Sequence, residues 1–165
     1  MEMPDALVYG VFANAPPHQA AFVRRVTGSP PLVHCELLFA KRKKTFVAIQ
    51  GARSMLKNMD YSTYNPHVWT LVPFQSCTPD VEEALYRACE RRVNRPYNYM
   101  GLYTFIIPLV RARYPANSLF CSEALAEVFV ETGVFDHKRY SGHNIVPLKT
   151  SPTDFYHLFT LLNEV

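Results

Sequence analysis

The chain has 165 residues, of which 48% are hydrophobic and 19% charged. A chain of this length and composition can bury a core, which excludes wholesale disorder, and residues 1–165 are expected to form a single domain. The formal charge of +3 does not indicate nucleic acid as a partner, and 13 prolines exclude a long coiled coil.

Apolar and β-branched runs predict four strands in the first half of the chain, at 6–13, 32–39, 45–50 and 68–74. The charged run 41–44 separates the second strand from the third, and we expect a hairpin there. Its four basic residues are interpreted as a solvated turn rather than as a site for phosphates or acidic lipids.

Helix signals occupy the rest of the chain. Pro16-Pro17 precedes a predicted helix at 18–26, and Thr78-Pro79 starts a second one. Asn117-Ser118 is expected to cap a helix that runs to about residue 132, and Ser151 opens a final one. The order of elements predicts an α+β fold with a mainly antiparallel sheet packed against helices.

The start of the chain lacks the basic and apolar regions of a secretory signal, so an intracellular, reducing location is expected. The longest apolar stretch, 102–110, is about half of the ~20 residues that a membrane span needs, and Pro108 interrupts it. In a reducing compartment cysteines are more often free or catalytic than bridged. Three of the four, Cys35, Cys77 and Cys89, are expected to be packing residues.

Cys121 differs from the other cysteines because it falls in the first turn of a predicted helix. Unpaired N–H groups and the positive end of the helix dipole favour a thiolate at that position. His34 on the second strand is a candidate base for this nucleophile, and a third polar group must orient its ring. Gln50 and Glu36 are the two candidates for that role. Glu36 shares a strand face with His34, whereas Gln50 is on the next strand.

Four segments, in this order, resemble the circularly permuted branch of the NlpC-type papain-like superfamily. That branch includes bacterial YiiX-like proteins, poxviral homologues and the lecithin:retinol acyltransferase group. The segments span nearly the whole chain: 33–37 with His34, 97–101, 120–125 with Cys-Ser-Glu, and 151–155. The order of His before Cys is the order of the permuted branch.

The resemblance implies a permuted papain-like fold in which Cys121 is the nucleophile and His34 the general base. The third catalytic position falls on Gln50, which ranks ahead of Glu36 as the residue that orients the imidazole. The backbone N–H of Cys121 would contribute to an oxyanion hole.

The same resemblance places Tyr97 in the substrate pocket, and Glu36 and Ser122 are also expected to belong to the oxyanion and substrate pocket. The chain departs from the family pattern at Asn98, where Asp is frequent, and at Ala124, where Leu often follows Cys-Ser-Glu. Both departures bear on substrate recognition.

Other sites are less well supported. His34, Cys35 and Glu36 do not form a metal-binding pattern, because Cys35 points to the opposite strand face and no second cluster at ligand spacing exists, so no metal or organic cofactor is expected. The remaining histidines are expected at the surface; His143 is the one in a loop suited to flank a site. No nucleic-acid motif is present.

The expected function is therefore a cysteine-dependent hydrolase or acyltransferase that forms a thioacyl intermediate on Cys121. Its substrate would be a peptide or isopeptide amide in a protein, or a lipid ester, with peripheral membrane contact in the lipid case. If the source is a virus, the host cell or the virion is its setting. The alternative is a catalytically idle binding or virion-associated module, which Asn98 and the lack of an acidic third residue motivate.

Overall fold

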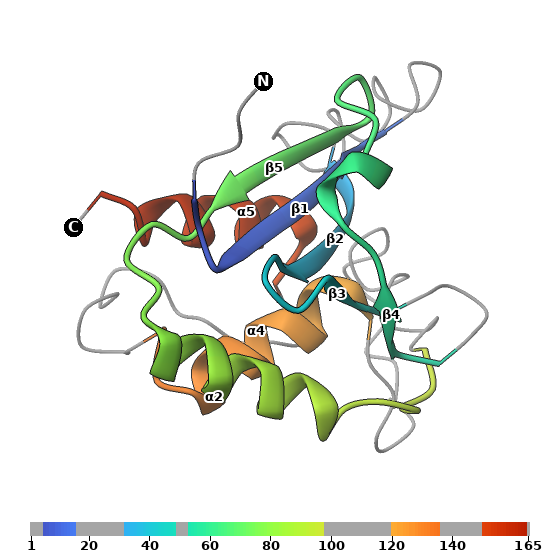
Figure 1. The fold of residues 1–165 in the computed structure, drawn as a ribbon. Coiled ribbons are helices and arrows are strands. Elements are labelled where there is room, and N and C mark those ends of the chain that lie inside the picture. The colour runs from blue at the N-terminus through green and yellow to red at the C-terminus, as the bar shows by residue number, and fades with distance from the viewer. Residues whose placement is uncertain (1–4, 16–31, 49–52, 98–119, 136–149, 165) are drawn as a thin grey trace.

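Within the part of the chain that the structure describes, five antiparallel strands form a sheet in the order β4-β3-β2-β1-β5 (Figure 1). The computed structural model describes residues 5–15, 32–48, 53–97, 120–135 and 150–164. The strands are β1 (Val8–Asn14), β2 (Leu32–Phe39), β3 (Lys44–Val47), β4 (Met55–Asn58) and β5 (Trp69–Pro73).

Three α-helices of the described chain are α2 (Pro79–Glu90), α4 (Cys121–Glu131) and α5 (Pro152–Leu161), and a short 3-10 helix, η1 (Tyr61–Thr63), precedes β5. Helix α4 packs on β2, α5 packs on β1 and β2, and α2 packs on α4 (Figure 1). No helix in the described ranges is long and apolar enough to cross a membrane.

The α+β class, the antiparallel sheet and the single domain are confirmed. Strand β2 has the predicted bounds, and the pairing of Leu38 with Thr45 confirms the hairpin. Strand β4 was not predicted, because Met55-Leu56-Lys57-Asn58 has no β-branched residue and forms an edge strand of the sheet. The predicted helix at 18–26 lies outside the described residues.

Helix caps were predicted with mixed success. Thr78 and Ser151 cap α2 and α5 through their side chains, as expected. The cap predicted at Asn117-Ser118 is wrong, because Phe120 is the N-cap residue and the helix begins at Cys121. Glu123 explains this start, since its Oε2 accepts the backbone N–H of Phe120 at 3.2 Å and closes the first turn without a polar cap residue.

The main core lies between the sheet and the helices and uses much of the chain's phenylalanine. Phe12 of β1 contacts Phe155 and Phe159 of α5, and Phe159 also contacts Phe129 of α4, with ring centroids 5.7–6.1 Å apart. Gly10 is required at this junction, because a Cβ there would lie 2.8 Å from the Phe12 ring and 3.1 Å from Phe159. The aromatic content therefore holds α4 and α5 against the sheet.

A second, smaller cluster covers the other face of the sheet. Tyr9, Val11 and Leu38 are buried there beneath Tyr64, and Trp69 packs against them. The segment between β4 and β5 supplies Tyr64, so this face of β2 is also shielded from water. Both faces of the central strand are thus covered, which sets the environment of its polar residues.

The sequence suggested that the basic turn 41–44 is a solvated loop. In the structure, Arg42 of this turn makes contacts with α2. Arg42 donates to both carboxylate oxygens of Glu82, at 2.6 and 2.9 Å, and to Glu83, and its guanidinium lies 4.2 Å from the centre of the Tyr86 ring. A bidentate pair with stacking fixes orientation as well as charge. Arg42 therefore fastens the β2–β3 hairpin to α2.

The cluster of basic residues after α2 also has a structural use. Arg92 is buried and forms ion pairs with Glu127 at 3.1 Å and Glu131 at 2.6 Å, while Arg95 lies 3.5 Å from Glu127. These pairs join the end of α2 to α4. They hold in place the helix whose first residue is Cys121.

We expect Arg42→Ala to lower the free energy of unfolding by about 1–3 kcal/mol, because it leaves the buried Glu82 carboxylate without its bidentate partner. Urea unfolding followed by circular dichroism measures this. Lys41→Ala is the matched control, since it removes the same charge from an exposed neighbour and should change stability by less than about 0.5 kcal/mol. Equal losses in the two variants would show that the hairpin does not depend on the Arg42 contacts.

Candidate thiol–imidazole site

Cys121 is the first residue of α4, where the helix has its unpaired backbone N–H groups. Its N-cap, Phe120, has an extended backbone with φ −102° and ψ 172°, so the chain turns sharply into the helix at this cysteine. Cys121 is 2% exposed. The prediction that Cys121 lies in the first turn of a helix is confirmed.

The sulfur of Cys121 lies against β2 and contacts two consecutive residues of that strand. The side chain of His34, the thiol of Cys35 and the backbone N–H of Cys35 interact with this sulfur. Among the described residues, β3 pairs with β2 only as far as Leu37, so no described strand occupies the β3 side of Cys35. The start of α4 is thus brought to β2 just beyond the end of that ladder.

These contacts set the charge on both partners. The pKa of Cys121 is well below its ordinary value, because the Cys35 thiol donates to the sulfur and His34 adds a second hydrogen bond and a positive charge, which together outweigh burial. Burial acts to lower the pKa of His34, but its bonds to Cys121 and Glu36 raise it to about 10. Both shifts favour the thiolate of Cys121 and the imidazolium of His34 over the neutral pair.

Glu36 holds the imidazole from the strand face that the two residues share. His34 Nε2 donates to Glu36 Oε1 at 3.2 Å, and Lys57 Nζ lies 3.8 Å from the same oxygen. Burial acts to raise the pKa of Glu36, but the bonds from His34 and Tyr64 and the nearby cations hold it below its usual range. A doubly protonated ring has one N–H for Glu36 and one for Cys121.

Glu36 is itself fixed by a buried hydroxyl chain. The Tyr64 hydroxyl donates to Glu36 Oε2 at 2.7 Å and, having given its only proton, accepts from Thr45 Oγ1 at 3.1 Å. Burial and the Glu36 charge raise the pKa of Tyr64, which keeps it a neutral donor. The carboxylate is buried as well as hydrogen-bonded, since the Glu36 side chain is 4% exposed.

Trp69 completes the surroundings of the imidazole. Ala13 is paired with His34 on one side and with Trp69 on the other, so the three residues form one row across the sheet. Because Ala13 is small, the Trp69 and His34 rings meet above it in an edge-on contact, 6.1 Å between centroids. The exposed fraction of the His34 side chain is 24%, so the imidazole is partly open to solvent.

Of the remaining predicted site residues, the structure describes some, and others lie outside the described residues. Ser122 is fully buried, and its Oγ has no hydrogen-bond partner within the described ranges. Tyr97 is half-buried and packs against the main core. Gln50, His18, His137 and His143 lie outside the described residues. The roles given to Ser122, Tyr97 and Gln50 stay predictions.

Sequence reasoning missed three parts of the site. Tyr64 comes from the connection between an unpredicted strand and β5, and no periodic signal marks it. Trp69 was recognised only as a strand residue, although the register of β1 against both neighbours brings it to His34. Cys35 was expected to be packing only, yet it also contacts the sulfur of Cys121.

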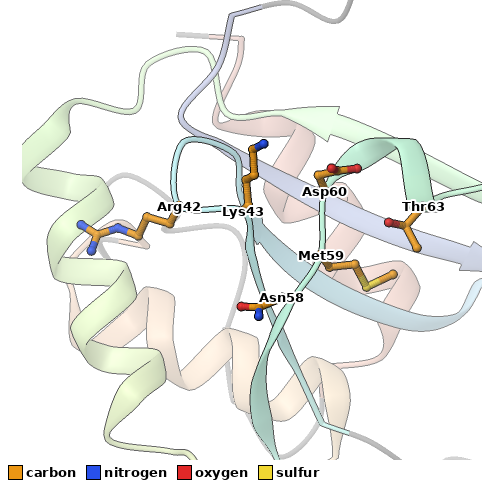
Figure 2. Close-up of a pocket in the computed structure, with 6 residues that line it drawn as sticks. All are labelled: Arg42, Lys43, Asn58, Met59, Asp60 and Thr63. Carbon is orange, nitrogen blue, oxygen red and sulfur yellow. The ribbon is translucent and has the colours of Figure 1, made fainter.

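No metal site competes with the pair in the described chain. No group of three or more His, Cys, Asp or Glu residues there is arranged to hold a metal ion. A shallow pocket lies at the turn end of β2, opposite His34, and is lined by Arg42, Lys43, Asn58, Met59, Asp60 and Thr63. Figure 2 shows Arg42 turned away from Asp60 and Thr63, toward α2, where its carboxylate partners lie.

Comparisons with known proteins found no matching family model, no matching curated protein and no matching solved structure.

We expect Glu36→Gln to move the pH midpoint of iodoacetamide alkylation at Cys121 upward by about one unit or more. Loss of the carboxylate charge lowers the pKa of His34, and a neutral ring no longer stabilises the thiolate. The pKa of Cys121 therefore rises, and the thiol becomes protonated at a higher pH. Mass spectrometry of the alkylated cysteine, measured across pH, gives the midpoint.

Glu83→Gln is the control, because it makes the same chemical change at an exposed carboxylate of α2 that bonds Arg42 and Arg87. Its alkylation midpoint should equal that of the unmodified chain. A Glu36→Gln midpoint that also stays unchanged would remove Glu36 from the site.

Proposed function

We propose that this chain is a cysteine-dependent hydrolase or acyltransferase of the permuted papain-like type. The observation that carries the proposal is the contact of Cys121, first residue of α4, with His34 of β2, which in turn is bonded to Glu36. A nucleophile, a base and a residue that orients the base are the minimum set for acyl transfer. The chain order, with the His strand before the Cys helix, supports the permuted arrangement.

In the proposed reaction the Cys121 thiolate attacks the carbonyl carbon of the substrate and forms a C–S bond. The carbonyl oxygen becomes an oxyanion that the backbone N–H groups at the start of α4 stabilise. The imidazolium of His34 then gives its proton to the leaving amine or alcohol as the carbon–heteroatom bond breaks. Water, or another acceptor, loses a proton to His34 and releases the acyl group from the sulfur.

We assign the orienting role to Glu36. A carboxylate stabilises the imidazolium, whereas the neutral amide of Gln50 would only select a tautomer. The short bond from Tyr64 and the proximity of Lys57 keep Glu36 ionised in its buried position. An acidic third residue also answers the sequence argument for an idle module, which was that such a residue is lacking.

The surface beside His34 favours an apolar group on the substrate. Val33, next to His34 on β2, is 40% exposed, and Val68, whose carbonyl accepts the N–H of Asn14, is 42% exposed. Both valines therefore lie at the end of the sheet where the imidazole is open to solvent. A fatty acyl ester, or an amide flanked by apolar side chains, fits this end of the sheet.

The second candidate is the idle binding module. The observation in its favour is the 2% exposure of Cys121, which leaves the sulfur little access to a large substrate. In that case the charged pair would serve as a structural link between α4 and β2 and would not turn over. The two candidates differ in whether the thiol accepts an acyl group.

We expect incubation with a p-nitrophenyl ester of a short fatty acid to add one acyl group at Cys121, detected by intact mass and peptide mapping. Cys121→Ala should abolish the adduct, and His34→Gln should slow acylation by about 10²–10⁴-fold. Cys77→Ala is the control and should acylate normally, because burial raises the pKa of Cys77 to about 12. Absence of a Cys121 adduct with ester and peptide amide substrates alike would favour the idle module.

A further inference from the structure

The contact between Cys35 and Cys121 is not used by the proposed reaction. The two thiols come from β2 and α4 and interact with each other, and both are free and buried in the main core. A disulfide requires the two sulfurs to be ~2.05 Å apart, and we expect side-chain movement to close that distance.

The two thiols differ in chemical character. Cys121 is held as a thiolate, and oxidants attack thiolates. Burial and the neighbouring thiolate raise the pKa of Cys35, so it keeps its proton while it donates to Cys121. Cys121 is therefore the sulfur that reacts with the oxidant, and Cys35 is the neighbouring thiol that can react next. A cysteine next to a reactive one is the usual partner that resolves a sulfenic acid.

We propose that Cys35 and Cys121 form a reversible disulfide when hydrogen peroxide oxidises Cys121. The thiolate attacks one peroxide oxygen, so that an S–O bond forms, the O–O bond breaks and the departing hydroxide takes a proton from His34. Cys35 then attacks the sulfenic sulfur of Cys121, its S–H proton leaves with the hydroxyl as water, and the S–S bond replaces the S–O bond. The two thiols lose two electrons in total, and peroxide becomes two waters.

The disulfide would inactivate the Cys121 nucleophile and at the same time protect it from irreversible oxidation. Without Cys35, a sulfenic acid at Cys121 would go on to sulfinic acid, which thiols do not reduce. The disulfide instead returns to two thiols with a dithiol reductant. The inference shares the Cys121 thiolate with the proposed function but requires no substrate.

The other two cysteines do not offer this chemistry. Cys89 is buried in the core on α2, and Cys77 lies half-buried before it, and in both the pKa is raised by burial. They serve as internal controls. Trypsin separates all four, because the cleavage positions place Cys35 in 26–41, Cys77 in 58–87, Cys89 in 88–91 and Cys121 in 114–138.

The test is to treat the full chain with hydrogen peroxide, block remaining thiols with iodoacetamide and map tryptic peptides without reduction. A cross-linked pair of peptides 26–41 and 114–138 that dithiothreitol removes is the expected result. Overturning results are a Cys121 that ends as sulfinic acid with no cross-link, or cross-links that join Cys77 or Cys89 as often.

Cys35→Ala gives the second readout, with Cys77→Ala as its matched control. After prolonged peroxide, dithiothreitol should restore alkylation of Cys121 almost fully in the unmodified chain and in Cys77→Ala, and at least about fivefold less in Cys35→Ala. Equal recovery in all three proteins would overturn the proposal. The mapping of the unmodified chain stands even if Cys35→Ala fails to fold.

The two proposals fail in different ways. If untreated Cys121 accepts an acyl group but no cross-link to Cys35 forms, the disulfide is wrong and the proposed function stands. If the cross-link forms but no substrate acylates Cys121, the disulfide stands and the proposed function falls.

Discussion

The contact between the first residue of α4 and β2 is the interaction on which the rest of the site depends. It brings a thiol at a helix N-terminus to an imidazole on a strand, and each favours the charged form of the other. The ion pairs of Arg92 and the phenylalanine core serve this contact, because they fix α4 against α2, α5 and the sheet. A shift of α4 along the sheet would separate the pair and leave the buried Cys121 sulfur without His34.

The second constraint is the burial of Glu36 on the face of β2 that it shares with His34. A buried carboxylate is costly unless it is paired and hydrogen-bonded, and here Tyr64, Lys57 and His34 together meet that cost. The covering cluster around Tyr64 therefore has a role beyond packing. It keeps water from Glu36, whose side chain is 4% exposed, so the charge of Glu36 acts at short range in a weakly screened environment.

Much of the fold and part of the candidate site could be predicted from the sequence. The parts that could not be predicted have physical reasons. Strand β2 was placed with its bounds, and Cys121 at a helix start, because apolar runs and helix dipoles are local signals. The sequence ranked Gln50 ahead of Glu36, and Gln50 lies outside the described residues. The buried contact of Glu36 with His34 could not be foreseen, because it depends on Tyr64, 28 positions later. Strand alternation put Cys35 away from the site, but a sulfur beside the strand backbone is reached by consecutive residues. No periodicity contains that information.

The central claim is that His34 is an imidazolium at neutral pH, paired with the Cys121 thiolate and with Glu36. The most direct measurement is a titration of the His34 ring followed by ¹⁵N nuclear magnetic resonance. The account predicts two protonated ring nitrogens through neutral pH, with deprotonation near the alkaline pKa of about 10. A ring that titrates near the ordinary histidine value of about 6.5, or below it, would contradict the account.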